Sequence, residues 1–167
     1  MFQGEAHRID EPMAALMQRL TRHLSDEELV RRLGEHAIIG DLPGPEIEWI
    51  AKHGTLRRFA TGALMSSPRF GRIEEMSIVL TGRMTQYAER GGGRRRVMEW
   101  CGGHITGLLP FSRLTVPPGE GVVDEDAEIV AVHERDFREM IRECPELLSK
   151  VVRIMLDRAR HFTQADL

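Results

Sequence analysis

The sequence predicts a mainly β fold flanked by helices, on three observations. Apolar residues recur with helical spacing near both ends of the chain. Between Thr55 and His133 that period gives way to short apolar runs separated by turn residues. The chain has 167 residues, of which 41% are hydrophobic, so it can bury the core of one domain. We therefore expect a β-sandwich or small barrel, with helices before and after it in the sequence.

The first region, residues 1–41, is expected to be helical. Apolar residues between Met13 and Leu24 follow the spacing of one helix face. Ser25 and Glu28 then form a capping box, which predicts the start of a second helix. These helices would precede the barrel as an N-terminal element.

The second region, residues 42–133, should form the barrel. A short helix is expected between Pro45 and Gly54, because proline favours a first helical turn and glycine ends a helix. Turn residues such as Gly82 and the run Gly91–Gly93 separate the apolar runs that follow. The expected strands are 55–59, 63–66, 76–81, 83–89, 94–100, 121–124 and 128–133.

The third region, residues 134–167, is expected to hold a short helix over 134–142 and a long one from Glu146 to about Thr163, with Pro145 in its first turn. The long helix carries two apolar stripes, and two stripes favour two covered surfaces, one on the barrel and one on a second copy. A single broad face packed on its own domain is the alternative. The expected homodimer interface is Leu148, Val152, Met155, Ala159 and Phe162, and the second stripe is Leu147, Val151 and Ile154.

Charge and cysteine content exclude several classes of protein. The chain has 23 basic and 26 acidic residues, so no field of one sign marks a nucleic-acid or membrane surface. The longest apolar run, Met13–Met17, is far short of the roughly 18 residues that cross a bilayer, and the charged N-terminus is unlike a signal peptide. Cys101 and Cys144 form no CxxC pair, as is typical of a reducing compartment. We expect a cytoplasmic protein.

Several short segments carry a family resemblance: 56–59, 63–65, 77–83 with the "IVLTGR" hairpin, 129–132, 136–137 and "CPEL" at 144–147. In this order they resemble the cyclic-nucleotide-binding domain of the bacterial catabolite-activator and kinase-regulatory type. The resemblance runs from about residue 42 to 161 and implies a double-stranded β-helix, or jelly-roll, barrel with N-terminal helices and a long C-terminal helix. The helices before the barrel and the ending at 158–162 are similar to the input segment of soluble sensor histidine kinases, which implies a downstream signalling domain in the same chain.

In that family, a glycine-bounded loop with a short helix holds the cyclic phosphate on backbone N–H groups. A glutamate of the loop binds the ribose, and an arginine nine or ten residues later binds the phosphate. Here Gly103 and Gly107 match the loop, but Leu108 stands at the glutamate position and Pro117 and Pro118 stand where the arginine would fall. Leucine accepts no hydrogen bond and proline offers neither charge nor N–H. Ordinary cAMP or cGMP binding is therefore not expected, and no cofactor is implied.

The loop is still the candidate ligand site. Arg113 is its only arginine and could receive an anion from another direction. The apolar residues Ile105, Leu108, Leu109 and Phe111 would either line a pocket for a less polar ligand or plug the barrel. The candidate ligand-binding residues are Gly103, Gly107, Leu108, Leu109, Ser112, Arg113, Thr115, Pro118 and Gly119.

Other chemistry finds little support. A metal enzyme of cupin type needs several imidazoles on neighbouring strands, but only His104 and His133 lie in the β region. The segment from Gly91 to Arg96 lacks the ending of a phosphate loop, and Cys101 with His104 lacks an orienting group. We therefore expect no catalytic residue and no metal. We also expect no DNA binding, since DNA-binding relatives need a helix-turn-helix of about 60 residues after the long helix and this sequence stops at Leu167.

The sequence thus indicates a regulatory domain of a larger signalling protein, with an unknown small-molecule ligand and a helix that dimerises. Two alternatives stay open. The chain could be a ligand-free dimerisation or interaction module, or it could bind a cyclic nucleotide through non-standard contacts. Binding of any small molecule to the native state would separate the first alternative from the others.

Overall fold

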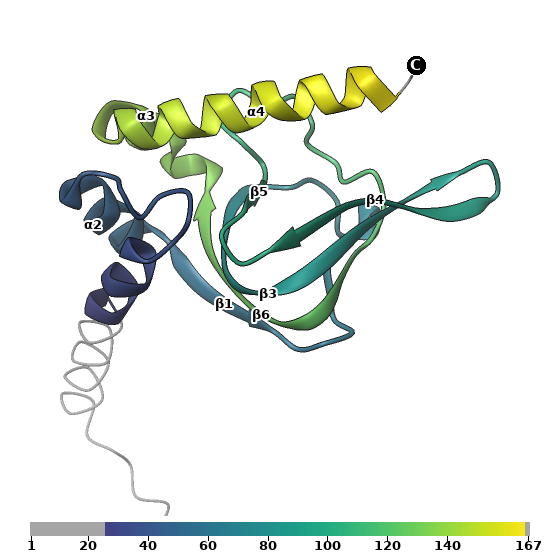
Figure 1. Ribbon diagram of the computed structural model, residues 1–167, viewed down its shortest axis with the longest axis horizontal. Coiled ribbons are helices and arrows are strands. Elements are labelled where there is room, and N and C mark those ends of the chain that lie inside the picture. Colours follow the sequence, from purple (N-terminus) through teal and green to yellow (C-terminus); the bar gives the residue numbers. More distant parts are fainter. Residues whose placement is uncertain (1–25, 166–167) are drawn as a thin grey trace, which may run out of the picture.

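The computed structural model describes residues 26–165, and Figure 1 shows their arrangement. Helical residues 26–34 come first. The expected helix over 13–24 and the Ser25 cap lie outside the described residues. The elements that follow are α2 (Gly44–His53), β1 (Thr55–Phe59), β2 (Leu64–Ser66), η1 (Pro68–Phe70), β3 (Glu75–Arg90), β4 (Gly93–Cys101), β5 (Ile105–Gly107), β6 (Gly121–His133), η2 (Glu134–Asp136), α3 (Phe137–Glu143) and α4 (Pro145–Ala165).

Two long strands, β3 and β6, form the centre of one antiparallel sheet. The main path is β1-β6-β3-β4, with β2 added on β6 and β5 added on β3. Strand β3 pairs with β6 along most of its length, and its far end pairs with β4 in a hairpin that extends away from the rest of the sheet (Figure 1). The sheet curls around an interior, as the predicted jelly-roll fold with flanking helices requires.

The predictions of a turn at Gly82 and of an "IVLTGR" hairpin at 78–83 are both wrong. Gly82 lies inside β3, which continues from Glu75 to Arg90, and the pairing register with β6 shifts on both sides of this residue. Its φ is +88°, and a Cβ there would lie 2.4 Å from the carbonyl oxygen of Asp126. Glycine is therefore required for a bulge that bends the strand, rather than for a turn that reverses it. The two strands expected over 121–124 and 128–133 likewise merge into β6.

Side chains on the two faces of the sheet enter two different cores. On β3, Ile78 points toward the helices while its neighbour Val79 points toward the barrel interior. On β6, Val130 and Ile129 divide in the same way. This alternation follows from the two-residue period of a strand. The helices thus cover one face, and the other face encloses the interior.

The helical side is well packed. Leu33, Ile50, Leu147 and Val151 are fully buried in the same core, so the expected short helix after Pro45 and the second stripe of the long helix are both confirmed as packing elements. In Figure 1, α2 and α3 lie against one end of the sheet and α4 runs across the barrel.

A buried carboxylate joins α2 to α4. Glu46 is 4% exposed, and its two oxygens accept the backbone N–H groups of Glu146 at 3.1 Å and Leu147 at 2.8 Å. These N–H groups belong to the first turn of α4, where a helix has no internal acceptors and where its dipole favours negative charge. Glu46 therefore fixes where α4 begins. Within the described residues, no helix has the length and apolar character needed to span a membrane.

Candidate ligand-binding cavity

The barrel interior is not completely filled. A cavity of about 490 Å³ lies between the inner face of the sheet, the β5–β6 loop and α4. Its volume is within the range of small-molecule sites. The apolar part of its wall comes from the strands, η1 and the loops, and includes Phe59, Met65, Phe70, Ile73, Met84, Val97, Met98, Trp100, Leu114 and Ile129.

A smaller set of polar groups shares this wall. Hydroxyl and amide groups come from Ser66, Ser67, Ser77, Gln86 and Thr106. The wall has three arginines, and two of them are neutralised by carboxylates: Arg57 pairs with Glu75, and Arg72 pairs with Glu134. The cavity is therefore mostly apolar, with a few groups that could orient a ligand.

The third arginine, Arg158, comes from α4. It donates a hydrogen bond to the carbonyl oxygen of Ile105, and its guanidinium carbon lies 4.4 Å from the centre of the Trp100 ring. Burial lowers the pKa of this guanidinium to about 10, so it stays charged at neutral pH. The cation–π contact and the hydrogen bond together tie the C-terminal helix to β4 and β5 at the cavity wall.

Sequence reasoning did not select Arg158 or Trp100. A pattern that could have found Arg158 is the buried stripe of α4, in which Leu147, Val151 and Ile154 are followed four residues later by this arginine. A charged residue that continues an apolar stripe must lie against the domain, where its buried charge needs hydrogen-bond or ion-pair partners. Trp100 has no such pattern, because its position depends on the pairing of β3 with β4.

The predicted loop contributes less to the cavity than expected. The resemblance implies a short helix between β5 and β6, but the described structure has none there, only a turn in which the Ser112 N–H donates to the Leu109 carbonyl at 3.0 Å. Leu108 and Leu109 are each 4% exposed, and Leu109 joins the helical-side core. Arg113 is exposed and does not line the cavity. The loop therefore has no helix N-terminus on which to hold a phosphate.

The remaining loop candidates are spread over three places. Gly107 and Pro118 line the cavity. Gly107 has a φ of +76°, and a Cβ there would lie 2.4 Å from the Glu75 carbonyl oxygen, so glycine is required at this edge. The carbonyl of Thr115 accepts the Ile73 N–H at 2.7 Å, and the Gly103 N–H donates to the Val79 carbonyl of β3 at 2.9 Å. Gly119 packs against Tyr87 and Ala88 of β3. The structure brings only part of the candidate set to the cavity.

Cys101 and His104 lie close together, but their contact serves a turn. The Sγ of Cys101 is 3.7 Å from Nδ1 of His104, and the same nitrogen accepts the backbone N–H of Cys101 at 3.0 Å. Among the side chains that the structure describes, no three His, Cys, Asp or Glu residues are grouped as a metal site would require. This pair thus stabilises the turn after β4.

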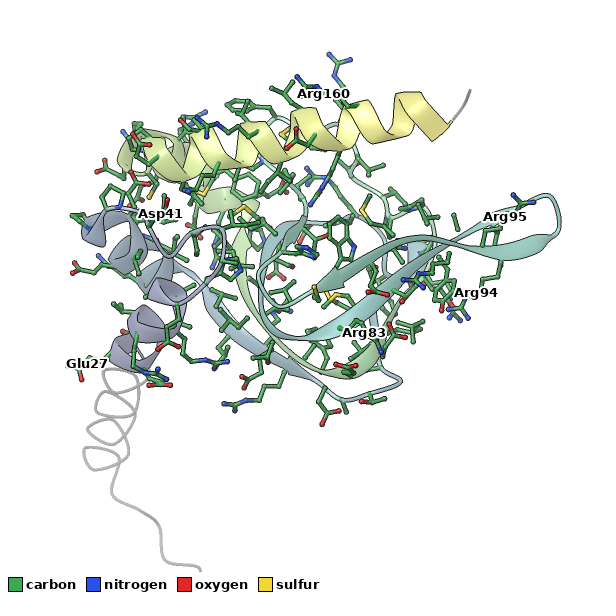
Figure 2. All side chains as sticks on the ribbon, in the orientation of Figure 1. Glu27, Asp41, Arg83, Arg94, Arg95 and Arg160 are labelled. Atoms are coloured by element: carbon green, nitrogen blue, oxygen red, sulfur yellow. The ribbon has the colours of Figure 1, made fainter. Side chains whose placement is uncertain are left out.

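The expected interface residues of α4 fall on two levels of exposure. Val152 and Ala159 are exposed, whereas Leu148 and Met155 are half-buried, and Met155 packs against the helical-side core. The Phe162 side chain lies outside the described residues. In Figure 2, Arg160 projects from the side of α4 that faces away from the barrel. Leu156 on the same helix is 55% exposed.

In the sequence comparisons, no family model and no curated protein matches the chain. Solved structures do match. A triple mutant of the regulatory subunit of a cAMP-independent protein kinase A from Trypanosoma brucei, bound to cAMP, gives a TM-score of 0.68 at 16% identity and covers 87% of this chain. The match covers 53% of that subunit, so this chain spans about half its length.

Two bacterial structures also match the fold of this chain. The catabolite activator protein of Thermus thermophilus gives a TM-score of 0.61 at 20% identity, covering 78% of this chain and 60% of that one. A cyclic nucleotide-binding domain from Methylobacillus flagellatus gives 0.63 at 14% identity, covering 84% and 80%. The chain has the cyclic-nucleotide-binding fold. This confirms the fold that the sequence resemblance implied, while a histidine-kinase context is not among these matches.

Proposed function

We propose that this chain is a regulatory domain that binds a small molecule in the barrel cavity and reports occupancy through α4. The observation that carries this proposal is the position of Arg158, which belongs to α4 and forms part of the cavity wall. A molecule in the cavity would contact the helix directly. Such a ligand shifts the arrangement of α4 if it binds one arrangement more tightly than another.

The ligand proposed here is not an ordinary cyclic nucleotide. Gly107 at the end of β5 lines the cavity together with Leu114, Pro117 and Pro118 of the β5–β6 loop. None of these residues can bind a ribose hydroxyl or a phosphate through a side chain. Losing one charge-assisted pair reduces affinity by about one to two decades. The T. brucei regulatory subunit belongs to a cAMP-independent kinase, and its triple mutant is bound to cAMP. The shared fold therefore does not by itself require cAMP as the ligand of this chain.

The proposed output is an effect on a linked signalling domain, such as a histidine kinase, through a dimer of α4. The exposed residues Val152 and Leu156 support a second apolar contact on this helix, because both lie outside the core that covers Leu147 and Val151. Light scattering should give a mass of two chains for the wild type and one for Val152→Glu. Ser149→Glu, at an exposed position one turn earlier, is the matched control.

Ligand binding is tested by thermal melting with a library of small organic acids, amides, cAMP and cGMP. Binding to the native state must raise the melting temperature. Val97→Trp should reduce or remove the shift, because Val97 lies at the cavity wall and a tryptophan there would occupy part of the space that the ligand needs. Val116→Trp, at an exposed position that does not line the cavity, should keep it.

The outcomes separate the alternatives. A shift that Val97→Trp removes supports the cavity as the ligand site. No shift with any compound favours the ligand-free dimerisation module. Micromolar calorimetric binding of cAMP or cGMP would show that a cyclic nucleotide is held by non-standard contacts and would overturn the choice of ligand.

A further inference from the structure

We propose that Arg158 is the anion-binding residue of the cavity, so that the ligand is a mainly apolar molecule with one carboxylate group. This inference rests on the proposed function, because it assumes that the cavity is the ligand site. It adds the chemical class of the ligand and the contact through which α4 would sense it.

The first support is the pairing of the charges at the wall. Three arginines line the cavity, and Arg57 and Arg72 are each bonded to a glutamate. Within the described part of the chain, Arg158 has no carboxylate within ion-pairing distance; its guanidinium donates a hydrogen bond to the Ile105 carbonyl and lies over the Trp100 ring. A guanidinium has five N–H donors in a planar fork, so it retains donors for a two-oxygen acceptor.

The second support is the environment of this charge. Arg158 is partly removed from water, which lowers its pKa, yet at about 10 the group remains a cation at neutral pH. A desolvated cation without a counter-ion forms stronger hydrogen bonds with an anion than an exposed arginine does. Arg113 of the loop is exposed and lies away from the wall, so it does not compete for this role.

The third support is the rest of the wall, which sets the body of the ligand. Phe59, Met65, Met84 and Ile129 border the cavity and belong to or pack against the inner core. Two acidic residues also line the cavity: Glu75 pairs with Arg57, and Glu74 is exposed, with its Oε2 3.6 Å from Nε2 of His133. Among the described residues of the wall, Arg158 is the half-buried cation without a carboxylate partner, and it fits one anionic group on an apolar molecule.

The binding step would also reach α4. A carboxylate bound to Arg158 would either replace the Ile105 carbonyl as the hydrogen-bond acceptor or share the guanidinium donors with it. Either change alters the contact that ties α4 to β5 and to Trp100. The ligand would therefore act on the same helix that the proposed function assigns to signal output.

The test uses the full chain and two probes of nearly equal shape, 4-phenylbutanoate and its neutral amide, in titration calorimetry at pH 7.5. We expect the acid to bind at least about tenfold more tightly than the amide. Arg158→Met should remove this preference, whereas Arg158→Lys should keep part of it because the charge remains. Arg153→Met, an exposed arginine on the same helix, should bind both probes like the wild type.

Each outcome has a defined meaning. Equal binding of acid and amide by the wild type, or an acid preference that survives in Arg158→Met, overturns the role of Arg158 but leaves the cavity as a ligand site. Binding of the amide or of cAMP, with no binding of the acid, likewise overturns the role of Arg158 but leaves the cavity as a ligand site. If none of the three compounds binds, the carboxylate inference is overturned, and a library screen without any melting shift overturns the proposed function as well.

Discussion

The two faces of the β3–β6 sheet are built differently. On the helical side, Leu33, Ile39, Ile50 and Leu147 are each 0% exposed and form one continuous core with α2, α3 and α4. On the inner side, the sheet contributes a smaller core and leaves a cavity of about 490 Å³. The same strands therefore carry one face that is filled and one face that is hollow.

This difference indicates where stability and function reside. Native cores are close-packed, so an unfilled cavity forgoes packing contacts and lowers stability. A cavity of this size is therefore expected to have a function. Here the hollow face also collects the desolvated Arg158 and several hydroxyl groups, while the filled face collects aliphatic side chains. Mutations on the filled face should change folding, and mutations on the hollow face should change ligand binding.

The largest expected effect is on the filled face. Leu147→Ala should lower the free energy of unfolding by about 3 kcal/mol, because it leaves a cavity in a fully buried site. Met65→Ala removes a half-buried side chain from the hollow face and should cost about 1 kcal/mol or less. Urea denaturation of both variants measures the difference. Equal losses would mean that the two faces are packed alike.

A second prediction concerns the link between α2 and α4. Glu46→Ala removes the acceptor of two N–H groups in the first turn of α4 and should cost about 2 kcal/mol of unfolding free energy. Glu48→Ala, on an exposed site of the same helix, should change it by less than about 0.5 kcal/mol. The pair is compared by thermal and urea unfolding. A Glu46 variant as stable as the Glu48 variant would contradict the capping role.

Sequence patterns predicted the filled face better than the hollow one. Helical spacing identified the stripe of Leu147 and Val151, because burial on a helix follows a local period. Gly82 was assigned to a turn, since a bulge and a turn both require positive φ and the sequence alone does not distinguish them. The contact of Arg158 with Trp100 depends on how α4 lies on the sheet, which no local pattern specifies.

The loop illustrates the same limit. The family resemblance directed attention to residues 103–119, where the glycine positions match. The structure places Leu109 in the helical-side core and Arg113 at the surface, and three prolines, Pro110, Pro117 and Pro118, remove backbone donors from this stretch. Spacing alone could locate the loop but not the direction in which each side chain turns.

A third prediction tests the junction between the N-terminal segment and the sheet. His36 is buried, with Nε2 3.1 Å from the Val79 carbonyl, and burial lowers its pKa below 6.5. As pH falls below 6.5, the unfolded chain takes up a proton that the folded chain resists, so stability should decrease. We expect the free energy of unfolding to decrease progressively as the pH falls from 7 to 5.5.

The control for that prediction is His36→Gln, which cannot titrate. It should be less stable than the wild type at pH 7, because it disturbs the bonds of a buried ring, but its stability should change less over the same pH range. Urea midpoints at several pH values provide the measurement. An identical pH slope in both proteins would assign the effect to another group.

The smallest expected effect is a difference in thiol reactivity. Burial raises the pKa of Cys144 to about 12, whereas Cys101 is half-buried at the end of β4. Iodoacetamide should therefore label Cys101 in the native protein at pH 8 and leave Cys144 unmodified, since the thiolate is the reactive form. Peptide mass spectrometry reads this directly. Labelling of Cys144 at a comparable rate would show that the filled face opens in the native state.

Amide hydrogen exchange with and without saturating 4-phenylbutanoate would show whether the ligand occupies the hollow face and contacts α4. Exchange should slow in β5 near Ile105 and in α4 around Arg158, with a smaller change in residues 108–119. Protection confined to residues 108–119, with α4 unchanged, would instead place the ligand in the loop and exclude a direct effect on α4.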